Sequence, residues 1–163
     1  MTWQWNLDAN QFRDQWKMLA EKLRQEEKSE LLRRATCSSF HQHYHELYTL
    51  SPAPLGYLKL KHFGQVRWIF KVRVGALHLN CVPWREDSAR RCALCNSGEE
   101  EDMLHFVAKC SVLAEIRCKW FGRAVLTPQQ TLELLKEEDQ VKTAEFAKEA
   151  WFYRWPLVQQ FNW

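Results

Sequence analysis

Three cysteines and one histidine near the middle of the chain have the spacing of a metal site. They form the pattern C-x2-C-x9-H-x4-C, made by Cys92, Cys95, His105 and Cys110. Two thiolates three residues apart can bind one ion from a tight turn, while a histidine within a helix and a cysteine just beyond its end close the other side. Thiolate and imidazole ligands suit Zn²⁺, and four protein ligands leave no position for a reactive water. The pattern therefore predicts one structural zinc ion.

Two other interpretations of this motif stay open. Buried cysteines often only pack, and a histidine beside an apolar residue such as Phe106 is commonly a hydrogen-bonded core residue. A redox pair at Cys92 and Cys95 would need a strand before it and a helix after it, but the following Asn-Ser-Gly indicates a turn. The later histidine and cysteine favour metal binding over both.

The remaining histidines and cysteines give weaker signals. Positions 41 and 45 can share a helical face, so a second metal candidate is the group His41, His43 and His45. Only one acidic neighbour, Glu46, accompanies it, and a solvated histidine cluster is the alternative. The other cysteines are interpreted as ordinary thiols: Cys37, Cys81 and Cys118. Six cysteines without an export signal indicate reduced thiols, so we expect an intracellular protein of the nucleus or cytoplasm.

Positive charge gathers just upstream of the metal motif. Residues 51–91 contain eight basic and two acidic residues, whereas 92–163 contain eight basic and eleven acidic residues. The basic segment is predicted to contact RNA or DNA phosphates, with Trp68, or else Trp84, stacking on bases. The predicted contacts are Lys59, Lys61, Arg67, Lys71, Arg73, Arg90 and Arg91. A solvated basic face and packed tryptophans are the competing interpretations.

Hydrophobic periodicity predicts a mostly α fold, a small helical domain with the zinc knuckle embedded in it. The expected helices begin after Asp8, near Phe40, at Phe63, at Asp102, after Ser111, at Pro128 and near Val141, the last bending or ending at Pro156. A strand is the alternative for residues 63–76, because β-branched residues are dense there. Gly75 and Gly122 are predicted to end their helices.

Four segments are expected to form one compact unit. They are N-terminal helices at 1–50, a basic helical or connection segment at 51–91, the zinc knuckle with its following helix at 92–125, and C-terminal helices at 126–163. A hydrophobic content of 46% is enough for a buried core. No run of about 18 uncharged apolar residues occurs, so no membrane span is expected.

The C-terminal helix carries aromatic residues on all sides. They are Trp151, Phe152, Tyr153, Trp155, Phe161 and Trp163. Tyrosine and tryptophan are favoured at interfaces, so residues Trp151–Trp163 are the basis of an alternative function as a protein-interaction scaffold. Docking onto the chain's own core is the competing interpretation.

An enzyme is not expected. A metal site closed by four protein ligands offers no activated water, and no nucleophile stands next to a base. The only other cysteine and histidine close in sequence are His78 and Cys81, which is weak support for catalysis. The late acidic residues have ordinary helix-surface spacings.

Several short sequence motifs between about Leu47 and Arg117 resemble those of a known protein family. They are Ile69–Leu77, Arg91–Asn96, Glu100–Asp102, His105 with Phe106, and Cys110. In this order they resemble the region after the polymerase core in non-LTR retrotransposon reverse transcriptases of the jockey-like insect type. The resemblance implies thumb or connection helices, a CCHC zinc knuckle, and RNA or target-DNA handling by a domesticated or fragmentary copy. It does not imply polymerisation, because the aromatic-x-Asp-Asp motif that binds two catalytic metal ions is absent.

Overall fold

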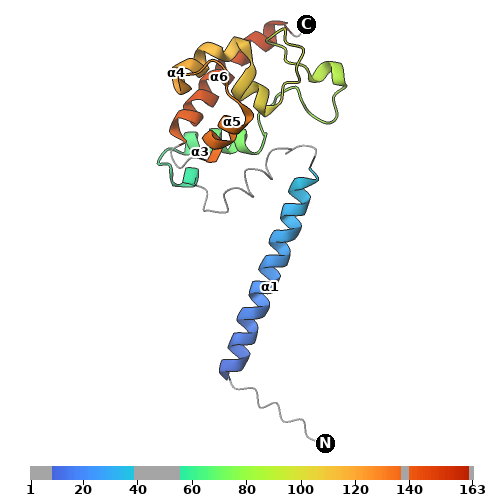
Figure 1. The fold of residues 1–163 in the computed structure, drawn as a ribbon, viewed down its shortest axis with the longest axis vertical. Coiled ribbons are helices and arrows are strands. Elements are labelled where there is room, and N and C mark those ends of the chain that lie inside the picture. The colour runs from blue at the N-terminus through green and yellow to red at the C-terminus, as the bar shows by residue number, and fades with distance from the viewer. Residues whose placement is uncertain (1–8, 39–55, 137–139, 162–163) are drawn as a thin grey trace, which may run out of the picture. The chain divides into compact units, whose positions relative to one another are not determined.

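A computed structural model describes residues 9–38, 56–136 and 140–161 of the chain (Figure 1). The predicted cap at Asp8, the short helix near Phe40 and the His41, His43 and His45 cluster lie outside these residues. By its internal contacts the chain divides into two units, Met1–Ser38 and Ser39–Trp163, where the sequence predicts one. The metal motif lies in the second unit.

The first unit contains the long helix α1, Ala9–Thr36. Its apolar residues Phe12, Trp16, Leu19 and Leu23 follow one another at steps of four, three and four residues, a spacing that predicts a helix. The helix continues past Leu32. Ion pairs within the helix, such as both Arg33 and Arg34 with Glu30, add local support at spacings of three and four residues.

In the described residues of the second unit, the regular elements are all helical segments joined by loops. They are η1 (Gly56–Lys59), α3 (Phe63–Arg73), η2 (Asp87–Arg90), η3 (His105–Lys109), η4 (Ser111–Leu113), α4 (Ala114–Phe121), α5 (Pro128–Lys136) and α6 (Val141–Phe161). Across the described ranges the only β pairing is one isolated bridge between Arg91 and Glu100. The mostly α prediction is confirmed, and the strand alternative for residues 63–76 is wrong because that segment forms α3.

Local sequence signals set several helix ends. The Thr127 hydroxyl accepts the Gln130 N–H at 3.2 Å while the Gln130 side chain accepts the Thr127 N–H at 3.0 Å, which is a reciprocal cap for α5. Gly75 and Gly122 have positive φ values of 65° and 70°, a conformation that costs glycine little. Both glycines end their helices as predicted.

Pro156 does not end α6. The sequence predicts that Pro156 bends or ends the helix. The helix continues to Phe161, so an end at Pro156 is wrong, while a bend stays a prediction. A proline inside a helix removes one backbone hydrogen bond. Burial of Val158 in the next turn stabilises the continued helix, which is a tertiary contribution that the local sequence does not reveal.

Helix α6 is central to the second unit, because both α3 and α4 pack against it (Figure 1). The apolar spacing of this helix predicts a buried stripe at Ala144, Phe146 or Ala147, Ala150 and Trp151. The three alanines and Phe146 are buried, and Trp151 is half-buried. The ring of Phe146 lies 4.9 Å from that of Phe121 and 6.1 Å from that of Phe106, between centroids. The three cysteines of the metal motif belong to the same apolar cluster, so the site is built onto the core.

No helix in the described part of the chain is both long enough and apolar enough to cross a bilayer.

Candidate metal centre

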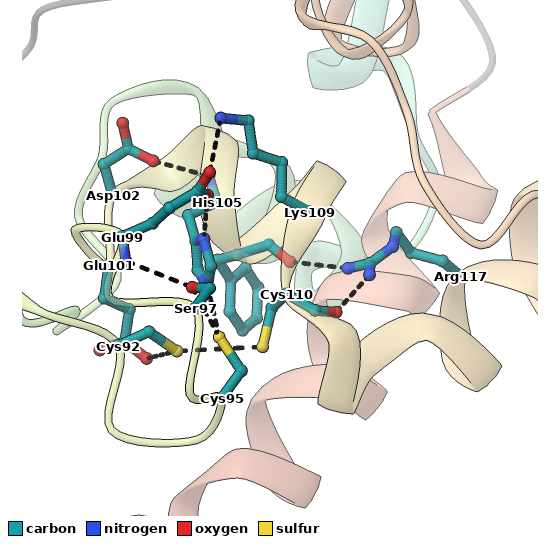
Figure 2. Close-up of polar contacts among 11 residues, drawn as sticks. Cys92, Cys95, Ser97, Glu99, Glu101, Asp102, His105, Lys109, Cys110 and Arg117 are labelled. Carbon is teal, nitrogen blue, oxygen red and sulfur yellow. Dashed lines mark hydrogen bonds and ion pairs between the residues drawn. The ribbon is translucent and has the colours of Figure 1, made fainter.

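A tight turn after η2 presents the first two cysteines. The backbone around Cys92 pairs with the segment before Asp102: the Cys92 N–H donates to the Glu99 carbonyl at 2.9 Å, and the Glu101 N–H donates to the Arg90 carbonyl at 2.8 Å. These bonds close the loop of residues 92–101, which holds Cys92 and Cys95 at its inner side (Figure 2). We call it the metal loop. The loop is short and needs no sheet to support it.

His105 and Cys110 come from the helical turn that follows. The Asp102 carboxylate accepts the His105 N–H at 2.6 Å and so caps this turn. The Cys110 N–H then bonds to the His105 carbonyl at 2.8 Å, five residues back, which makes η3 a π-helix. Residues five apart point in different directions on an α-helix of 3.6 residues per turn, whereas the wider π turn brings them nearer one face. The sequence predicts a helix here but not this widened turn.

The four predicted ligands converge. Sγ of Cys92 lies 3.9 Å from Sγ of Cys110, and Sγ of Cys95 lies 3.3 Å from Nε2 of His105. All four ligand atoms lie within 4.8 Å of one another, and all four residues are buried (Figure 2). The three cysteines are free thiols and not disulfides. The cluster is therefore close enough to hold a metal ion.

The remaining cysteines do not join the cluster. Cys37 and Cys118 are exposed and Cys81 is half-buried, so none is part of the group of four. Among the described residues no second group of histidines, cysteines and carboxylates converges in this way.

Glu99 orients the imidazole of His105. Its carboxylate lies 3.0 Å from Nδ1, on the side of the ring that faces away from the sulfurs, and Lys109 lies 3.5 Å from the same carboxylate. A proton on Nδ1 donated to Glu99 leaves the Nε2 lone pair facing the cysteines. The arrangement is the carboxylate and histidine pairing common around metal ions.

Cys92 and His105 hold their protons when no metal ion competes for them. A hydrogen bond to Cys110, reinforced by burial, raises the pKa of Cys92 to about 12, and the same bond lowers the pKa of Cys110. Burial lowers the pKa of His105, but hydrogen bonds to Cys92 and Glu99 outweigh it and raise the pKa to about 9. A metal ion binding here has to displace these protons.

A buried ion pair joins the metal loop to α6. Arg154 donates through Nε to Oε1 of Glu101 at 2.8 Å and through a second nitrogen to Oε2, while Oε2 also accepts the Asn80 N–H at 3.0 Å. Oε1 lies 3.7 Å from Sγ of Cys92. Because Glu101 and Arg154 are almost fully buried, the position of the loop depends on a residue of the last helix.

A second buried cation, Arg117, holds the other side of the cluster. Its guanidinium donates to the backbone carbonyls of Cys110 and Phe106 (Figure 2). It also donates to the carbonyl of Ala124, and it has no carboxylate partner in the described residues. Satisfied hydrogen bonds make its burial tolerable, and one of them places its charge at the backbone of Cys110.

Sequence reasoning found the four ligands but missed the residues that support them. The acidic run containing Glu99 and Glu101 has no special spacing, and Arg154 is far away in sequence. Arg117 looks like an ordinary surface residue of α4 by position alone, because nothing local marks the carbonyls that it meets.

The residues predicted to bind nucleic acid differ in how far their side chains are exposed to solvent. Lys59, Lys61, Arg67 and Arg91 are exposed, while Lys71, Arg90 and Trp68 are half-buried. The Arg90 guanidinium donates hydrogen bonds to the backbone carbonyls of Arg85 and Pro83.

Arg73 does not fit the predicted phosphate-binding role. It is buried, donates to the Leu135 carbonyl and lies over the ring of Tyr57. Its place on the inner side of α3 is decided by the packing of α3 against the rest of the unit, which the charge pattern does not show.

No family model, curated protein or solved structure matches the chain. The likeness to retrotransposon reverse transcriptases therefore stays a prediction from short sequence motifs.

Proposed function

We propose that the four-residue cluster binds a structural zinc ion and that the second unit is a zinc-stabilised, non-catalytic module that binds RNA or DNA. Zn–S distances of about 2.3 Å and Zn–N distances of about 2.0 Å give tetrahedral edges of about 3.8 Å between sulfurs and about 3.5 Å between sulfur and nitrogen. The separations of 3.9 Å for the two sulfurs and 3.3 Å for sulfur and nitrogen match these edges closely. This convergence of four donors is the observation that carries the proposal.

Charge around the cluster also suits zinc. Three thiolates and one Zn²⁺ have a net charge of −1, and a buried anion needs a nearby cation. Arg117 supplies it through its bond to the Cys110 carbonyl. Four buried protein ligands leave no open position for water, so the ion stabilises structure and does not activate a nucleophile.

The nucleic-acid part of the proposal rests on exposed basic residues with no acidic partner. Lys59, Lys61 and Arg67 lie in or beside η1 and α3, which pack together, and Arg91 precedes the metal loop. None of these four forms an ion pair among the described residues. Their charges are therefore available to phosphates.

Filter-binding titrations of the zinc-loaded protein with RNA and duplex DNA across salt concentrations test this proposal. A triple variant with Lys59, Lys61 and Arg67 changed to Ala is expected to make the slope of log affinity against log salt shallower by about 2 to 3. A matched triple variant with Arg123, Lys136 and Lys142 changed to Ala removes equal charge elsewhere and is expected to keep the slope. No binding at low salt, or equal loss in both variants, would contradict the proposal.

The retrotransposon origin is part of the proposal. A basic helix followed by a CCHC loop is the order that the sequence resemblance implies, and α3 precedes the Cys92 loop in this order. Zinc thiolates need reduced cysteines, which supports a place in the nucleus or cytoplasm.

A second candidate function is protein binding by α6. It is favoured by the exposure of the aromatic residues Phe152 (61%), Tyr153 (48%) and Trp155 (50%). Aromatic side chains left in water on a helix commonly mark an interface.

A further inference from the structure

The structure brings together two groups of aromatic residues that lie far apart in the sequence. Trp68 of α3 and Phe152 of α6 contact each other edge to face, with ring centroids 6.0 Å apart. Trp68 belongs to the basic segment, whereas Phe152 belongs to the aromatic C-terminal helix. The nucleic-acid candidate and the protein-binding candidate thus share one surface.

This surface continues along α6. Trp155 lies three residues after Phe152 and so occupies the same side of the helix, and its ring is 6.1 Å from that of Trp151. We call Trp68, Phe152 and Trp155 the aromatic face. Phe152 and Trp155 are at least half exposed, while the opposite side of α6 is buried in the core. Rigid rings that are open to solvent on one side are available for stacking.

The charges beside the aromatic face are positive. Lys71 Nζ lies 5.1 Å from the Trp68 ring centroid, and Lys148 is exposed one helical turn before Phe152. Neither lysine forms an ion pair among the residues whose placement is described.

The nearby acidic residues of α6 offset only part of this positive charge. Glu149 is paired with Lys119 and also accepts a hydrogen bond from Trp120, whereas Glu145 accepts a hydrogen bond from the neutral Gln65 and keeps its charge. Two lysines against one carboxylate without a cationic partner among the residues that the structure describes leave a net positive charge, which complements a polyanion.

We propose that the aromatic face is a stacking platform for unpaired bases of single-stranded nucleic acid, with Lys71 and Lys148 contacting its phosphates. Single strands expose the faces of their bases, whereas a duplex hides them in the stack. Positive charge interleaved with open rings is the combination that sequence-tolerant single-strand binding uses. This inference rests on the proposed function and adds that the preferred ligand is single-stranded.

Fluorescence polarisation with a labelled single-stranded oligonucleotide and a duplex of the same length tests the inference on the zinc-loaded full chain. Phe152→Leu and Trp155→Leu keep apolar bulk but remove the aromatic ring. Each is expected to lower single-strand affinity about 5- to 100-fold and to leave duplex affinity unchanged. Because both residues are exposed, folding should survive, and circular dichroism with zinc content checks this.

Tyr153→Leu is the matched control. Tyr153 is similarly exposed on the same helix, but it lies one turn after Glu149. Glu149 accepts a hydrogen bond from Lys119 of α4, so Tyr153 lies on the side of α6 toward α4 and not on the aromatic face. This variant is expected to bind single strands like the unchanged protein. Phe152→Trp, which keeps an aromatic ring at this position, is expected to keep the affinity for single strands.

The outcomes separate this inference from the function on which it depends. Absence of binding to either nucleic acid overturns both. Equal affinity for single strand and duplex, or unchanged single-strand affinity in Phe152→Leu and Trp155→Leu, overturns the stacking platform alone and leaves the aromatic face to a protein partner.

Discussion

The imidazole of His105 is held in the orientation that metal binding requires by one neighbouring side chain. Only one of its two nitrogens faces the sulfurs, because Glu99 holds the other at 3.0 Å. The carboxylate thus fixes the ring orientation before any ion arrives, and it keeps a proton on Nδ1 when the metal ion displaces the one on Nε2. A ligand fixed in this way loses less conformational entropy on binding.

Replacing Glu99 with Ala is expected to weaken zinc affinity about 10- to 100-fold, since outer-shell partners of a metal-bound histidine have effects of this size. Competition with a chromophoric chelator measures the affinity. Glu100→Ala is the matched control, because Glu100 is exposed and contacts Cys81 instead of His105. Equal effects of the two substitutions would argue against an orienting role for Glu99.

Zinc binding is expected to release at least two protons at neutral pH. The pKa of Cys92 is raised to about 12 and that of His105 to about 9, so both groups are protonated at pH 7 before metal binds. Affinity should therefore rise with pH, with competition from His105 ending above about pH 9 and competition from Cys92 persisting beyond it. Calorimetry in buffers of different ionisation enthalpy counts the protons. Binding without proton release would show that Cys92 and His105 are already deprotonated in the metal-free protein.

Among the elements, the metal loop and α6 depend on each other. The loop has few apolar residues of its own, and Glu101 anchors it to Arg154 through two hydrogen bonds in a buried position. A buried pair of this kind is weak support for overall stability, but breaking one side leaves an unpaired charge. The pair therefore sets where the loop lies more than how stable the unit is.

Arg154→Met and Glu101→Gln are each expected to lower the free energy of unfolding by about 3 to 5 kcal/mol, because each leaves a buried partner unsatisfied. The double variant should lose less than the sum of the two, by roughly 0.5 to 3 kcal/mol. Urea denaturation of the zinc-loaded protein measures all three. Lys119→Met, which removes the more exposed pair with Glu149, should cost at most about 1 kcal/mol. Additive losses would show that the two residues act independently.

For the whole molecule, the metal cluster belongs to the second unit alone. Its cysteines form part of the apolar core that also includes Phe106 and Phe146. Zinc binding in small peptides contributes about 10 to 16 kcal/mol of apparent free energy, which is comparable with the entire stability of an ordinary domain. Loss of the ion should therefore affect the unit as a whole.

Removal of zinc by a chelator, or the substitution Cys110→Ser, is expected to abolish the cooperative thermal unfolding of Ser39–Trp163. Near-ultraviolet circular dichroism followed with temperature, together with metal content, measures this. Cys118→Ser is the control because Cys118 is an exposed thiol outside the cluster. A metal-free protein with an unchanged unfolding transition would show that the cluster only packs.

The sequence alone determined the features that depend on near neighbours. Periodicity and caps predicted the five described α-helices but not the short helices η1 and η2, and ligand spacing predicted the four residues of the cluster, since a turn and the helical turn after it are local structures. The same reasoning allowed α6 to end at Pro156, but the helix continues to Phe161.

Only the tertiary structure decided which distant segments meet. Arg73 has the charge of a phosphate ligand but lies buried against Leu135, while Arg154 reaches Glu101 across 53 residues of sequence. Trp68 and Phe152 meet for the same reason, because α3 packs on α6. Contacts between distant segments depend on how helices pack as solid bodies, and no local pattern of residue types specifies that packing.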